Sequence, residues 1–205
     1  STGQASDSIK IPMSEILREP RTRRIALIGI AFVFSESTGV IWLPIALVQQ
    51  GFSPALAAFG YTLFGLGFMV MRFVGGPIAD ALGRQRVIIY SAILSCVGIV
   101  IFIASPMLGI PLVGAALWGI GNSIGVAMCV AALGDDPVRV NTRMTFFWIA
   151  AYAANLSVGP VLGTLSNLGG LVPTFTVPIV LFIAAALVSS SVSESHPESY
   201  AVKVD

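Results

Sequence analysis

Apolar residues fill six long stretches of the chain, and short polar or glycine- and proline-containing segments separate them. Each stretch approaches or exceeds the roughly 20 residues that a helix needs to cross the hydrocarbon core of a bilayer. The pattern therefore predicts an all-α integral membrane protein with six transmembrane helices. We expect these spans at about 25–48, 55–79, 87–104, 108–133, 144–166 and 171–190.

Among the connections between the predicted spans, only alternate ones carry positive charge. Arginines precede the first span and follow the second and fourth, at Arg18, Arg21, Arg23, Arg24, Arg84, Arg86, Arg139 and Arg143. The connections 49–54, 105–111 and 167–173 carry no charge. Because arginine-rich loops stay in the cytoplasm, we expect both termini to be cytoplasmic, in a multi-pass protein of the plasma (cell inner) membrane. Segment 1–24 is then a cytoplasmic linker and 191–205 a cytoplasmic tail.

The composition agrees with residence in a lipid bilayer. Of 205 residues, 56% are hydrophobic and 10% are charged, and the mean hydropathy is +0.90. A soluble domain has roughly a quarter of its residues charged. The net charge of +1 gives no reason to expect a nucleic-acid partner. Because the sequence starts at Ser1 without methionine or a signal-peptide pattern, we expect it to be part of a longer polypeptide.

Metal, cofactor and catalytic chemistry have no support in the sequence. Cys96 and Cys129 each lie inside an apolar run, distant in sequence from other cysteines and from histidine, which favours a packing role. His196 stands alone in the polar tail. We expect no cofactor, no metal and no enzymatic activity.

A charged loop separates the second and third predicted spans. It reads Gly76-Pro-Ile-Ala-Asp80-Ala-Leu-Gly83-Arg84-Gln-Arg86. The glycines permit close backbone approach, the aspartate offers a carboxylate at a helix end, and the arginines supply fixed positive charge. Such a combination suits an electrostatic latch. The spacing G-x-x-x-D-x-x-G-R-x-R resembles the signature loop of the major facilitator superfamily of transporters, which joins the second and third helices of each six-helix half.

The resemblance implies roles for the charged residues. Ala81 and Gln85 stand where basic residues are common in the family, as in the loop of the second half, so the chain is expected to be a C-terminal half. In the family, an acid at the end of the fourth helix can pair with the loop arginine, while the loop aspartate meets the start of the fifth helix. Acid pairs at a membrane face are otherwise usually only solvated. The implied cytoplasmic latch comprises Gly76, Asp80, Gly83, Arg84 and either Asp135 or Asp136.

Glu36 and Arg72 are the charged residues that lie well inside apolar runs. Each would cost on the order of 2.5–3.5 kcal/mol facing lipid at mid-membrane, so each should face the bundle interior. Similar depths in oppositely directed helices predict a buried ion pair between them. Snorkelling of Arg72 and local hydrogen bonding of Glu36 are the alternatives. Functionally, Glu36 is a candidate for substrate binding or proton coupling.

Aromatic and amide residues inside the spans are further candidates for a ligand cavity, since such groups in a helical bundle can hold a small molecule. They are Trp42, Trp118, Asn122, Trp148, Tyr152 and Asn155. Packing or interfacial anchoring is the alternative for each. Glu36, Arg72, Trp118 and Asn122 form the predicted set of substrate or coupling residues.

Two pairs of glycines have the four-residue spacing that places small residues on one helix face. They are Gly121 with Gly125 and Gly159 with Gly163. Close backbone packing brings helices together in lipid, so we expect these glycines at helix contacts. Smooth contacts that let helices slide during transport are the functional alternative.

The leading functional hypothesis is transport of a small solute by alternating access, with protons as a candidate coupling ion. This mechanism needs two halves around a shared site, so the expected partner is an N-terminal six-helix half or a second copy of the chain. The alternative is a six-helix membrane protein without transport activity, such as a scaffold or truncated product. An integral membrane enzyme ranks third, because the spans lack a catalytic cluster.

Overall fold

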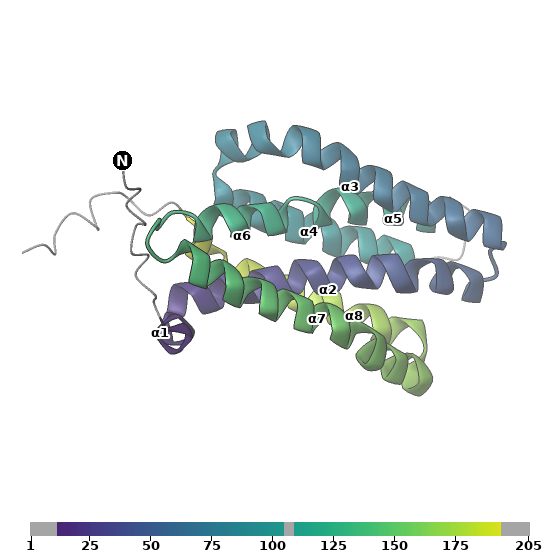
Figure 1. Ribbon diagram of the computed structural model, residues 1–205. Helices are drawn as coiled ribbons and strands as arrows, with labels where there is room; N and C mark the ends of the chain where they lie inside the picture. The colour runs from purple at the N-terminus through teal and green to yellow at the C-terminus, as the bar shows by residue number, and fades with distance from the viewer. Residues whose placement is uncertain (1–11, 105–108, 194–205) are drawn as a thin grey trace, which may run out of the picture.

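The computed structural model describes residues 12–104 and 109–193, and all regular structure in these ranges is helical. The long helices lie side by side in one elongated bundle (Figure 1). The helical elements of the described residues are α1 (Met13–Arg18), α2 (Pro20–Gln49), α3 (Pro54–Leu82), α4 (Arg84–Ala104), α5 (Ile110–Asn122), α6 (Gly125–Leu133), α7 (Val140–Gly169), α8 (Leu171–Leu187) and the 3-10 turn η1 (Ser189–Val192). His196 and most of the predicted tail lie outside the described residues.

The prediction of an all-α membrane bundle is confirmed. Within the described ranges, five segments are long and apolar enough to cross a membrane: α2, α3, α4, α5 taken with α6, and α7. The sixth predicted span falls on α8, which has 17 residues and is shorter than the others. Both described ends lie at the same end of the bundle, where the Arg21 side chain donates to the backbone carbonyl of Ser191 at 3.1 Å.

The loop between α3 and α4 is much shorter than the sequence suggested. α3 continues through Leu82 and α4 begins at Arg84, so Gly83 alone separates them. Gly83 has φ of 80°, a conformation that residues with a Cβ rarely adopt. Most of the signature stretch is therefore helical, and the glycine makes the sharp reversal.

The fourth predicted span is broken near its middle. α5 ends at Asn122 and α6 begins at Gly125, with Ser123 and Ile124 between them. Glycine, serine and asparagine have weak helix propensity, and an amide or hydroxyl side chain can bond to nearby backbone groups instead. The local sequence Gly121-Asn-Ser-Ile-Gly125 thus favours an interruption.

Helix α2 occupies the centre of the bundle and packs against α3, α6, α7 and α8. In the most apolar stretch of each span, 61% is buried for α2 and for α5 with α6, but only 22% for α3 and 28% for α7. α3 and α7 lie on opposite flanks of α2 (Figure 1). Each leaves large apolar side chains exposed, such as Phe73 on α3 and Leu156 on α7. These two helices therefore present surface that the described part of the chain does not cover.

The glycine pairs behave differently from each other. A Cβ on Gly121 would lie 2.6 Å from the Ser95 backbone nitrogen in α4, and one on Gly125 would overlap the Phe32 ring in α2. The packing prediction is confirmed for this pair. No such contact exists for Gly159 and Gly163 on α7 within the described residues, because a Cβ there would meet open space.

Candidate functional site

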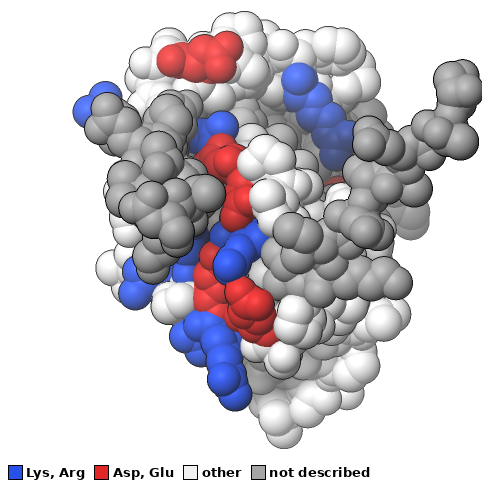
Figure 2. Space-filling model, turned by 60° about the vertical axis from the view of Figure 1, so that its left-hand side comes forward, with Lys and Arg blue, Asp and Glu red and all other residues white. Residues whose placement is uncertain are grey.

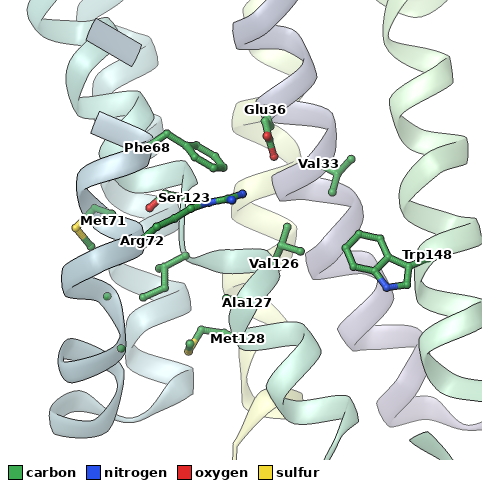
Figure 3. A pocket seen from close by; sticks show the side chains of 13 residues that line it. Val33, Glu36, Phe68, Met71, Arg72, Ser123, Val126, Ala127, Met128 and Trp148 are labelled. Carbon is green, nitrogen blue, oxygen red and sulfur yellow. The ribbon is translucent and has the colours of Figure 1, made fainter. Parts of the chain in front are cut away.

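A pocket of about 620 Å³ opens between α2, α3, α6 and α7, at the level where the fourth span is broken. Ser123 and Ile124, the two residues of the break, line it. Most of its other walls are apolar, with Met71 and Phe68 from α3 and Trp148 from α7 (Figure 3). The break therefore contributes directly to the wall of this cavity.

Glu36 and Arg72 both project into this pocket. Glu36 comes from α2 and Arg72 from α3, and Figure 3 shows the two charged ends pointing toward the same space. Glu36 is half-buried, whereas Arg72 is exposed on the open side of the bundle. The structure thus brings together the two charged residues that the sequence singled out within the spans.

The predicted direct ion pair between Glu36 and Arg72 is wrong. No nitrogen of Arg72 lies within 4.0 Å of a Glu36 oxygen, which is the limit for an ion pair. The Arg72 guanidinium instead lies over the Phe68 ring, 4.9 Å from its centroid, in a cation–π contact. Phe68 lies one helical turn before Arg72 and holds the guanidinium against α3. Glu36 and Arg72 therefore lie at similar depth without forming a bond.

Trp118 and Asn122, predicted as ligand residues, are buried between the helices in this structure. Trp118 is completely buried, donates from Nε1 to Ser35 Oγ at 2.8 Å, and packs edge-on against Phe64. Asn122 is also buried, and its Nδ2 donates to the Phe32 carbonyl at 3.3 Å. Neither residue lines the pocket, although Asn122 immediately precedes the helix break.

The remaining aromatic and amide candidates divide between the pocket and its surroundings. Trp148 lines the pocket. Asn155 donates from Nδ2 to Ser37 Oγ at 2.6 Å and so joins α7 to α2. Tyr152 is exposed on α7, and Trp42 is half-buried against the core. Among residues 12–104 and 109–193, no group of three metal-ligating side chains is present.

Ion pairs connect several helices at the end of the bundle where α1 lies. Figure 2 views this end and shows acidic and basic side chains in a mixed strip. Asp135 accepts from Arg84 at 2.7 Å and from Arg21 at 2.8 Å. Burial raises the pKa of Asp135, but the hydrogen bonds and charges of Arg84 and Arg21 outweigh it, so the net pKa lies below its ordinary value.

The second set of ion pairs was not predicted as a network. Arg143, whose side chain is 4% exposed, donates from Nε to Glu19 at 2.8 Å and lies 3.5 Å from Asp136. Arg139 pairs with Glu15 at 3.0 Å. Burial raises the pKa of Glu19, but hydrogen bonds from Arg143 and Thr22, with the arginine charges, lower it overall.

A sequence signal for this second set exists. Glu15 and Glu19 are four residues apart, as are Arg139 and Arg143, so two acids on one segment match two arginines on another. Glu19 directly follows α1 and Arg139 directly precedes α7, so each pair spans about one helical turn at the edge of its helix. The linker before α2 therefore binds the start of α7, and Ile16 of α1 is fully buried there.

The other residues of the predicted latch do not join these ion pairs. Asp80 is exposed, and it forms no hydrogen bond or ion pair with the described residues. Its predicted approach to the start of α7 is absent from this half, because α3 packs against α2, α4 and α5 and lies on the far side of α2. Gly76 lines the pocket, and Gly83 makes the α3–α4 reversal.

The sequence matches a protein family and several of its members. The profile of the Major Facilitator Superfamily matches residues 25–203. The chain is 25% identical over 171 residues to an uncharacterized MFS-type transporter of Yersinia pestis, covering 82% of this chain and 44% of that protein. It is 24% identical over 185 residues to the ribitol transporter of Klebsiella pneumoniae, covering 82% and 41%.

The fold of this chain is also similar to that of a solved structure. The crystal structure of FucP, a Major Facilitator Superfamily transporter in the outward conformation, aligns with a TM-score of 0.75 at 19% identity. The alignment covers 89% of this chain and 45% of FucP. The chain thus spans about half the length of the relatives that it matches. Since the family profile covers nearly all of its length, the chain belongs to the Major Facilitator Superfamily.

Proposed function

We propose that this chain is one six-helix half, the C-terminal one, of a transporter that moves a small solute across the cell membrane by alternating access. The observation that carries the proposal is the pocket with two charged side chains between α3 and α7, the two flanking helices with the least buried apolar surface. A second half placed against that surface would close the pocket into a central cleft. The family is one of transporters rather than enzymes.

The proposed orientation places the charged end of the bundle in the cytoplasm. Arginines gather at that end, and the connections at the other end carry no charge. Arg84 and Asp135 would then hold neighbouring helices together on the cytoplasmic side, as a latch that limits opening there. In this proposal Asp80 faces the second half, since Asp80 is exposed in this half.

Side-specific cysteine labelling tests the proposal without knowledge of the solute. The full-length protein containing this half is prepared with Cys96→Ala and Cys129→Ala, and a single cysteine replaces Ala127, an exposed residue of the pocket. Alternating access predicts that this cysteine reacts with impermeant reagents added from either side. Control cysteines at Ser53 and Asn167 should react from the outside only, since both lie at the uncharged end.

The outcomes separate the two functional hypotheses. If Ala127→Cys reacts from one side only under every condition, the protein is not an alternating-access transporter and the scaffold hypothesis gains. If the cysteines at Ser53 and Asn167 react from the cytoplasmic side only, the proposed orientation is inverted. Uptake into proteoliposomes then provides the direct measure of transport for any solute found.

A further inference from the structure

The pocket presents opposite charges that do not bond to each other. Glu36 and Arg72 approach it from different helices, and each lacks a hydrogen bond or ion pair within the described part of the chain. The contact of Arg72 with Phe68 leaves its donor nitrogens available, because a cation–π contact uses the face of the guanidinium rather than its N–H groups. The site therefore offers an acceptor and a set of donors separated by a gap.

The rest of the described lining restricts what can fill that gap. Beyond the two charges, the polar side-chain groups on the wall are the Ser123 hydroxyl and the Trp148 indole N–H, whereas Val33, Met71 and Met128 supply apolar surface. A ligand that enters from water must replace its own hydration with these groups. The walls match a molecule with concentrated charge and an apolar body better than one with hydroxyls on every carbon.

Resting on the proposed transport function, we propose that this pocket selects a zwitterionic solute with an apolar body. The anionic group of the solute bonds to the Arg72 guanidinium, its cationic group bonds to the Glu36 carboxylate, and its apolar part packs on the methionine and valine surface. A bridging zwitterion gives each protein charge an opposite partner at once. A solute with one charge would instead leave the site with a net charge and one side chain without a bonded partner.

Neutral polyols form the competing class of solute, because a relative of this chain is a ribitol transporter. A polyol can accept from Arg72 and donate to Glu36, but most of its remaining hydroxyls would lie against apolar walls. Buried hydroxyls without partners oppose binding. The charge arrangement of this half therefore favours the zwitterion.

The test compares ligands that differ only in charge. Thermal unfolding of the full-length protein in detergent is measured with leucine, methionine, phenylalanine and glycine betaine as zwitterions. The single-charge counterparts of leucine are 3-methylbutylamine, which lacks the carboxylate, and 4-methylpentanoate, which lacks the amine; ribitol represents the polyols. At least one zwitterion should raise the melting temperature, while the counterparts and ribitol at the same concentration should not.

Variants connect the ligand to the two charges. Glu36→Gln and Arg72→Gln should each weaken zwitterion binding by about 10- to 100-fold, the value of a charged hydrogen bond. Arg86→Gln, an exposed cation outside the pocket, is the matched control and should leave the affinity unchanged. If the pocket variants do not fold, the charge series on the unmodified protein still decides the question.

Three results would overturn the proposal: no zwitterion stabilises the protein, a single-charge counterpart or ribitol stabilises it at least as well, or both pocket variants bind the zwitterion normally. Cysteine accessibility at Ala127 is measured without ligand. A protein that passes that labelling test but prefers ribitol is still an alternating-access transporter, with only the solute class wrong.

Discussion

Replacing Arg143 with glutamine should destabilise the protein far more than the same change at Arg139. The two arginines begin the same helix and each meets one acid of the α1–α2 segment. Their environments differ: the Arg143 side chain is 4% exposed and the Arg139 side chain is 37% exposed. Loss of Arg143 would leave Glu19 and Asp136 without that counter-charge in a largely buried site.

The magnitudes follow from these exposures. Removing one partner of a buried ion pair costs about 3–5 kcal/mol, and the partial exposure of Glu19 places Arg143→Gln at about 3 kcal/mol. An exposed pair contributes about 0–1 kcal/mol, which applies to Arg139→Gln. At about 2–4 °C per kcal/mol for a protein of this size, the melting temperature should fall by about 6–12 °C for the first variant. For the second variant the fall should be at most about 4 °C.

Thermal unfolding in a mild detergent, followed by tryptophan fluorescence, measures both variants under identical conditions. A double-mutant cycle with Glu19→Gln then isolates the Arg143–Glu19 coupling, because the double variant lacks both charges. The reasoning is refuted if Arg143→Gln and Arg139→Gln cause equal losses. It is also refuted if the Arg143 and Glu19 effects simply add.

Three further predictions concern other contacts. Gly98→Ala should lower the free energy of unfolding by about 1–3 kcal/mol, since its Cβ would lie 2.4 Å from the Trp118 backbone nitrogen. Gly163→Ala on α7 places its Cβ in open space and should not destabilise the protein, so equal melting temperatures for the two variants would contradict this prediction. The melting temperature should be constant near neutral pH and fall below about pH 4.5. Glu19 and Asp135 have pKa values lowered by folding, so the stabilisation from their ionised forms is lost as the pH falls from the unfolded-state pKa through the folded-state pKa; melting temperatures measured across this pH range check the prediction. Arg84→Gln should lower the melting temperature more than Arg86→Gln, which removes an exposed arginine.

Hydropathy and charge spacing predicted the class of fold because they report properties of single segments. Five of the six apolar runs form helices long and apolar enough to cross a membrane, and the arginines outside the spans lie at one end of the bundle. Boundaries were less predictable: α2 begins at Pro20, before the predicted start at 25, because proline suits the first turn of a helix. The break after Asn122 was missed, since the apolar pattern continues through it.

The candidate site was predictable only in part, because side-chain contacts depend on how each helix is rotated about its axis. Depth correctly placed Glu36 and Arg72 near one pocket, but it could not foresee that Phe68, four residues before Arg72, would hold the guanidinium. Trp118 was predicted as a ligand residue on type alone. Its Nε1 finds Ser35 inside the bundle, which satisfies the indole in the core.

The same reasoning links the uncovered glycines of α7 to the proposed second half. Gly121 and Gly125 lie against α4 and α2, and a side chain there would displace a neighbour. Gly159 and Gly163 repeat that spacing on α7, yet nothing in the described half approaches them. Helix α7 also exposes Leu156, so its open surface combines large apolar side chains with smooth glycine positions. Those are the features that close helix–helix contact requires in lipid, which favours a helix of the second half as the partner for this surface.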